Sequence, residues 1–74
     1  MNPSLLRQIW SVVEATHATH LLNLDDAHLV QSLLGQFHTQ QPLNPEETKQ
    51  LSSYLYSRLS LIRDLASDRL ALSA

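Results

Sequence analysis

Cysteine is absent from the 74-residue sequence, which excludes disulfides, thiolate zinc sites, cysteine nucleophiles and thiol redox chemistry. Glycine occurs once and aromatic residues make up 5%, so the chain has little material for the turns and strands of a β-sheet. No apolar run approaches the roughly 18 residues of a membrane span, and the N-terminus lacks the charge pattern of a signal peptide. We therefore expect a cytoplasmic protein without membrane association.

Positive charge is also scarce, because five Lys and Arg stand against seven Asp and Glu and give a net charge of −2. Binding to nucleic acid depends on clustered cations that neutralise phosphates. A helix-turn-helix is disfavoured because the segment 25–38 has no Lys or Arg, and the helix that follows begins with Glu46 and Glu47. We expect no nucleic-acid partner.

Motifs for catalysis are missing as well. No serine lies in a G-x-S-x-G turn, and no glycine-rich loop could hold a phosphate. A few helices without a cofactor also leave little room for a ligand pocket of about 300 Å³ or more. We expect no catalytic residue, no bound cofactor and no enzyme activity.

Leucine-rich periodicity is what the sequence does contain, with hydrophobic residues at 43%. Apolar residues recur at spacings of three and four, which is typical of amphipathic helices that bury one face. The pattern predicts an all-α fold with three helices, over residues 3–22, 25–38 and 45–72.

Capping residues mark where these helices begin. Asn2 followed by Pro3 is typical of a helix start, and Asp25 is the expected N-cap of the second helix. Asn44 and Glu47 have the spacing of a capping box, in which each side chain bonds the backbone amide of the other. The third helix then continues without Gly or Pro.

The predicted third helix carries more apolar surface than two neighbours in one small bundle would cover. It would be about 40 Å long and would extend about 20 Å beyond the second helix. Its apolar residues occupy about half of the circumference, wider than the ~100° stripe of one packed face. These residues are Leu51, Tyr54, Leu55, Leu59, Leu61, Ile62, Leu65, Ala66 and Leu70.

We therefore expect a single domain over residues 1–74, a three-helix bundle that associates as a helical homodimer through its third helix. The alternative is a monomer whose extended helix end leaves a few leucines exposed. The predicted interface residues are Tyr54, Leu55, Arg58, Leu59, Ile62, Leu65 and Arg69.

Arg58 and Arg69 are unexpected, because both project into the apolar side of the third helix with no acidic residue three or four positions away. One interpretation is that each lays its stem over leucines and pairs with an acid of another helix or subunit, namely Asp25, Asp26 or Glu14. The other is that they mark an interaction surface beside tyrosines, where arginine is enriched.

Glu14 and His17 have the E-x-x-H spacing that places a carboxylate and an imidazole one turn apart on a helix, as in helical metal sites. They are the candidate metal ligands, against the simpler interpretation of a solvated helix face. The remaining histidines, at positions 20, 28 and 38, could also make association sensitive to pH.

The function expected from these patterns is a homodimeric protein–protein interaction module, an adaptor or regulator with an unidentified protein partner. The alternative is a dimeric metal-binding helical bundle that uses the E-x-x-H pair of Glu14 and His17.

Overall fold

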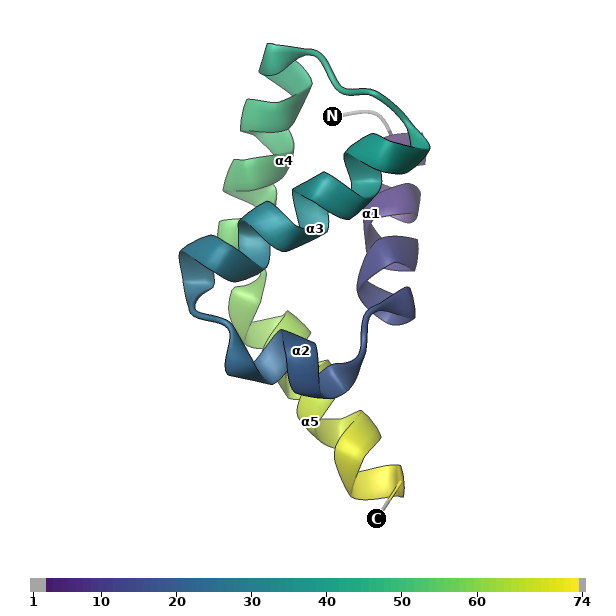
Figure 1. Cartoon of the computed structure of the whole chain (residues 1–74), viewed down its shortest axis with the longest axis vertical. Coiled ribbons are helices and arrows are strands. Elements are labelled where there is room, and N and C mark those ends of the chain that lie inside the picture. Colours follow the sequence, from purple (N-terminus) through teal and green to yellow (C-terminus); the bar gives the residue numbers. More distant parts are fainter. Residues whose placement is uncertain (1–2, 74) are drawn as a thin grey trace.

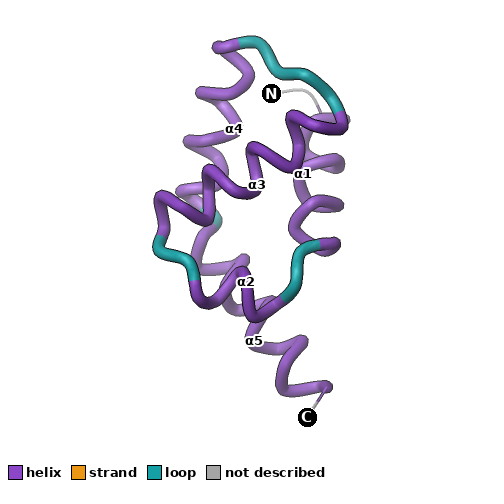
Figure 2. The backbone as a smooth tube through the Cα atoms, in the orientation of Figure 1, coloured by secondary structure: helices purple, strands orange, loops and turns teal. Residues whose placement is uncertain are grey.

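Helices account for nearly all of residues 3–73, the part of the chain that the computed structural model describes, and Figure 2 shows only short loops between them. The all-α expectation is confirmed, but the number of helices differs from the three expected. The five helices are α1 (Pro3–Ala15), α2 (Ala18–Asn23), α3 (Asp26–Gln40), α4 (Pro45–Ser57) and α5 (Leu59–Ser73). The expected cap Asn2 lies outside the described residues.

The helices form two groups along a molecule of 39 × 21 × 19 Å. At one end, α3 crosses diagonally over α1 and α4 and contacts both (Figure 1). At the other end, the short α2 packs against α5, and the last turns of α5 project beyond the rest of the chain (Figure 1).

The prediction of one continuous helix over residues 3–22 was wrong, because the helix is interrupted at Thr16. The Thr16 hydroxyl donates to the carbonyl of Val12 at 2.7 Å and competes with the backbone for this acceptor. The Thr16 amide is shared between the carbonyls of Val12 and Val13, at 3.1 and 3.2 Å. His17 is then extended (φ −60°, ψ 139°), and the chain turns into α2.

The expected third helix over 45–72 is likewise interrupted, at Arg58. The Ser57 hydroxyl donates to the Tyr54 carbonyl at 2.6 Å, the group that an uninterrupted helix would pair with the Arg58 amide. The Arg58 amide donates instead to the Leu55 carbonyl at 3.0 Å, with Arg58 at φ −113° and ψ 8°. At the bend between α4 and α5, a side-chain hydroxyl thus takes the place of a backbone amide.

The predicted starts of the later helices are confirmed. Asp25 caps α3 by accepting from the His28 amide at 3.1 Å. In the capping box of α4, Asn44 accepts from the Glu47 amide at 2.7 Å, and the Asn44 amide donates to the Glu47 carboxylate at 3.1 Å. Local side-chain chemistry therefore fixes where α3 and α4 begin.

All five helices contribute to one hydrophobic core. Buried side chains of α1, α3 and α4 meet at one end, and those of α5 lie against α2 at the other. The buried apolar residues are Leu5, Ile9, Val12, Val13, Leu21, Leu29, Val30, Leu33, Phe37, Leu51, Leu55, Leu59, Ile62 and Ala66.

Two arginines of α5 hold the carbonyl ends of the two helices that precede α3. Arg63 donates to the carbonyls of Leu21 at 3.0 Å and Leu24 at 2.9 Å, and to the Asp26 carboxylate at 2.8 Å. Arg69 donates to the carbonyls of Glu14 at 3.0 Å and Thr16 at 3.1 Å. These carbonyls have no partner further along their own helices, so α5 completes α1 and α2.

A substitution at Gly35 tests whether this position is helical, as it is in α3. It lies exposed within α3, and a Cβ added there would meet no atom within 4 Å outside the helix's own backbone. Gly35→Ala should raise the free energy of unfolding by about 0.5–1 kcal/mol, because alanine has the higher helix propensity. Urea denaturation would measure the change, and a loss of stability would contradict a helical Gly35.

Arg63→Met tests whether the hydrogen bonds from α5 to the carbonyls at the end of α2 stabilise the fold. The substitution keeps much of the apolar stem but leaves the carbonyls at the end of α2 unpaired, so we expect the free energy of unfolding to fall by about 1–3 kcal/mol. Asp26→Asn is the matched control, because it removes the exposed ion pair and leaves the carbonyl bonds, and should cost less than about 1 kcal/mol. Equal losses in the two variants would show that the carbonyl bonds contribute nothing.

Candidate functional site

A row of leucines faces outward along α5. Leu61, Leu65 and Leu72 retain 46, 43 and 87% of their surface exposed. At 3.6 residues per turn they fall within about 40° of one another around the helix, so they share one side. We call these three residues the leucine row, and it is the most extended apolar feature on the outside of α5.

The predicted interface residues fall into different environments. Leu55, Leu59 and Ile62 are buried in the chain's own core, at 1, 8 and 0% exposure, so they are not free to contact a second molecule. Leu65 and Arg58 are exposed, whereas Tyr54 and Arg69 are half-buried. Of the predicted set, Arg58 and Leu65 are therefore the members that lie open to solvent.

The cover over the α5 members of this set, Leu59 and Ile62, is α2, a helix that the sequence patterns did not predict. The break at Thr16 lets the chain turn back, so that α2 crosses α5 and buries its own Leu21 there (Figure 1). The third helix was expected to carry more apolar surface than two neighbours in its own chain would cover, and α2 supplies part of that cover from within the chain. On α5, the large apolar side chains that remain uncovered are the leucine row and Leu70.

Tyr54 joins α4 to α1. The Trp10 indole N–H donates to the Tyr54 hydroxyl at 2.9 Å, and the two rings meet edge to face with centroids 6.4 Å apart. The guanidinium carbon of Arg58 lies 5.3 Å from the centroid of the Tyr54 ring, close enough for a cation–π contact. Arg58 thus lies at the surface beside an aromatic pair.

An arginine–acid pair between two helices is present, but its arginine is not one of the two that the sequence singled out. Arg63, which the sequence patterns did not single out, makes the ion pair with Asp26. Arg69 reaches Glu14 through its backbone carbonyl, and Arg58 contacts Tyr54. The signal for Arg63 was available, because the end of α2 has no Lys or Arg of its own to satisfy its last carbonyls.

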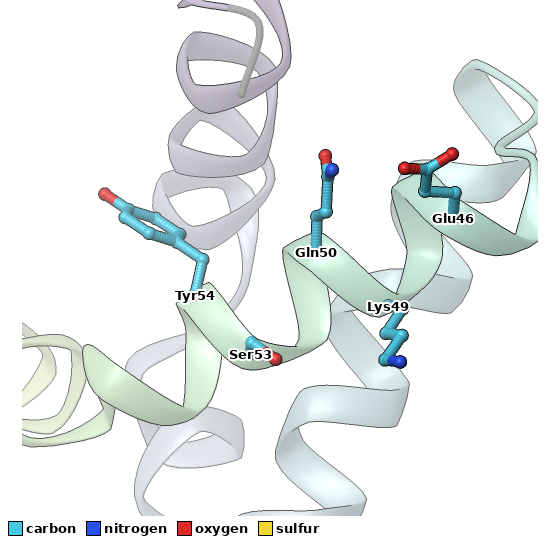
Figure 3. Close-up of a pocket in the computed structure, with 5 residues that line it drawn as sticks. All are labelled: Glu46, Lys49, Gln50, Ser53 and Tyr54. Atoms are coloured by element: carbon cyan, nitrogen blue, oxygen red, sulfur yellow. The ribbon is translucent and has the colours of Figure 1, made fainter.

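A hollow of about 710 Å³ lies along the outer side of α4 (Figure 3). Figure 3 shows Glu46 and Gln50 along one edge, while Lys49 points the other way. All of its lining residues come from this single helix, and the hollow is widely open, so it does not bring reactive groups to one enclosed point. The residues that line it are Glu46, Lys49, Gln50, Ser53 and Tyr54.

The candidate metal ligands Glu14 and His17 do not lie on one helix. Glu14 belongs to the last turn of α1, and His17 is the extended residue that precedes α2. The geometry that motivated the E-x-x-H hypothesis is therefore missing. Within residues 3–73, no three His, Asp or Glu side chains lie close enough together to hold a metal ion.

The histidines lie on α2 and α3 or beside them. His20 lies 3.2 Å from the Ser32 hydroxyl, and the Leu43 amide donates to Nδ1 of His38 at 3.2 Å. The ring of His28 contacts the Asp25 carboxylate. Each of these three rings therefore joins neighbouring segments of the chain.

The helices in the described range include none with the length and apolar character needed to cross a bilayer. Comparisons with known protein families, with curated proteins and with solved structures each returned no match.

Asp25 provides a pH test of the α3 cap. Hydrogen bonds from the His28 side chain and then from the His28 amide lower the pKa of the Asp25 carboxyl below its ordinary value. A lowered pKa means that the carboxylate stabilises the fold at higher pH and loses this effect as the pH falls through that value, below about 4.

In Asp25→Asn the amide still caps the helix but carries no charge. Wild type should be the more stable protein at pH 6, and urea denaturation should show the difference shrinking toward zero as the pH is lowered below about 4. A difference that stays constant across this range would contradict the contribution of the charge.

Proposed function

We propose that this protein is a homodimeric protein–protein interaction module, an adaptor or regulator that self-associates through the leucine row of α5. The observation that carries the proposal is the alignment of Leu61, Leu65 and Leu72 on one exposed side of a helix that buries Leu59, Ile62 and Ala66 on its other sides. Removal of exposed leucine from water stabilises an association by about 1.5–3 kcal/mol for each fully buried side chain.

The position of α5 supports this role. Its last turns project beyond the other helices (Figure 1). Leu61 and Leu65 are exposed with α2 in place, so a partner can approach them without displacing that helix. The opposite side of α5 holds Ile62 and Ala66 in the core and Arg63 against the end of α2, which keeps the helix in place. The exposed side is thus presented on a fixed support.

The proposal is of a binding role in the cytoplasm rather than of catalysis. One helix face buries less area than a standard interface of about 800 Å² per partner, so the dimer should be weak, with half-association between roughly 10 µM and 1 mM. Weak self-association of this kind suits a regulator whose state depends on its own concentration.

Leu65→Glu tests the proposal by sedimentation velocity over a concentration series. Wild type should shift from monomer toward dimer mass as concentration rises, and Leu65→Glu should raise the dissociation constant at least about 10-fold, because a charge replaces a buried leucine. Ser67→Glu is the matched control, since it adds the same charge to the same helix about 140° away from the row.

The control should associate as wild type does. Strictly monomeric wild type at about 1 mM would overturn the proposal, and so would Leu65→Glu and Ser67→Glu with the same effect.

A further inference from the structure

Two residues of opposite charge flank Leu61 and Leu65, the first two residues of the leucine row. Arg58 precedes Leu61 by three residues, and Asp68 follows Leu65 by three, while the two leucines are four apart. Arg58 directly precedes α5, and the other three residues belong to that helix. At 100° per residue, the four side chains point within about 80° of one another around the helix axis. Along this side the order is positive, leucine, leucine, negative, with spacings that are the same from either end.

Among residues 3–73, neither charge has an ionic partner. The ion pairs between residues 3 and 73 join Asp25 to His28 and Arg63 to Asp26. Asp68 is exposed, and the exposed Arg58 rests on the ring of Tyr54. Both groups are therefore placed to meet charges brought by another molecule.

The orientation of a partner copy decides which charges meet. In a parallel pair each residue lies opposite its own copy, which sets Arg58 against arginine and Asp68 against aspartate. In an antiparallel pair centred at position 63, Arg58 lies opposite Asp68 of the partner subunit, and Leu61 lies opposite Leu65 of the partner subunit. Like charges held opposite each other are unfavourable and opposite charges attract, so the two orientations differ in energy.

We infer that two copies of this chain pair antiparallel through Arg58, Leu61, Leu65 and Asp68, with each α5 crossing the other at position 63. This inference rests on the proposed self-association and adds its orientation and register. The two central leucines supply the apolar contact, and two symmetric ion pairs close it at either end. The interface is self-complementary, as a two-fold dimer requires.

Asp64 opposes this arrangement. Asp64 is exposed and points about 80° to one side of the leucine row around the helix axis. An antiparallel pair brings the same side of both helices together. The two copies of Asp64 therefore lie near each other. Asp64→Asn should therefore strengthen the antiparallel dimer. In a parallel pair the same aspartate would face the side that carries Arg69, and Asp64→Asn would weaken association.

A spin-label distance tests the orientation directly, because the cysteine-free chain accepts a single label at Leu72→Cys. Leu72 is exposed, points to the same side as the four contact residues and lies beyond them along α5. In this register it faces no residue of the partner's α5, so a labelled protein that no longer associates would overturn the register. In the antiparallel register, position 72 lies opposite position 54, an offset of about 18 residues or about 27 Å along the helix. Pulsed electron paramagnetic resonance at about 1 mM should then give a label distance of at least about 25 Å.

A parallel pair gives a shorter distance. It has no offset along the helix, and its helix axes lie about 8–10 Å apart, so two labels on the facing sides would lie below about 20 Å. A distance in that range would overturn the antiparallel register while leaving self-association intact. A monomeric mass for wild type at the same concentration, with no dipolar signal from the labelled protein, would overturn both proposals.

Charge reversal tests the register by a second route. Arg58→Asp and Asp68→Arg should each raise the dissociation constant about two- to fivefold, and the double variant should return it toward wild type. Absence of this rescue in variants with unchanged helical circular dichroism would also overturn the register.

Discussion

The bonds from Arg63 to the carbonyls at the end of α2 are the constraint on which the rest of this structure depends. A six-residue helix is too short to be stable in water alone, so α2 exists because α5 satisfies its last carbonyls and covers its Leu21. Because α2 is held there, one side of α5 is buried in the core. The leucine row is left on the opposite side, which links the fold to the proposed interaction surface.

The helix starts were predictable from the sequence because they depend on neighbouring residues. Asp25, Asn44 and Glu47 bond amides within three positions, and any chain that places them before an apolar run gains the same cap. The interruptions at Thr16 and Ser57 were not predictable in this way. Hydroxyl bonds to nearby carbonyls occur in continuous helices too, and here packing of the flanking helices decides that the chain turns.

The candidate site was predictable in part. The width of the apolar surface on the third helix indicated that more than one segment lies against it, and part of the cover is α2 of the same chain. Leu55, Leu59 and Ile62 therefore joined the core, and only the outermost part of that surface stayed exposed. Periodicity gives the face of a residue around its helix, whereas it does not say which segment lies against that face.

The central claim is that the outer side of α5 is a contact surface between two copies of the chain. A concentration series of amide nuclear magnetic resonance spectra of the wild-type protein tests it most directly, because each residue reports its own environment. We predict shifts that grow with concentration and cluster around Arg58, Leu61, Leu65 and Asp68, with α3 unchanged. Spectra that are identical from about 10 µM to 1 mM, or shifts confined to α1 and α3, would contradict it.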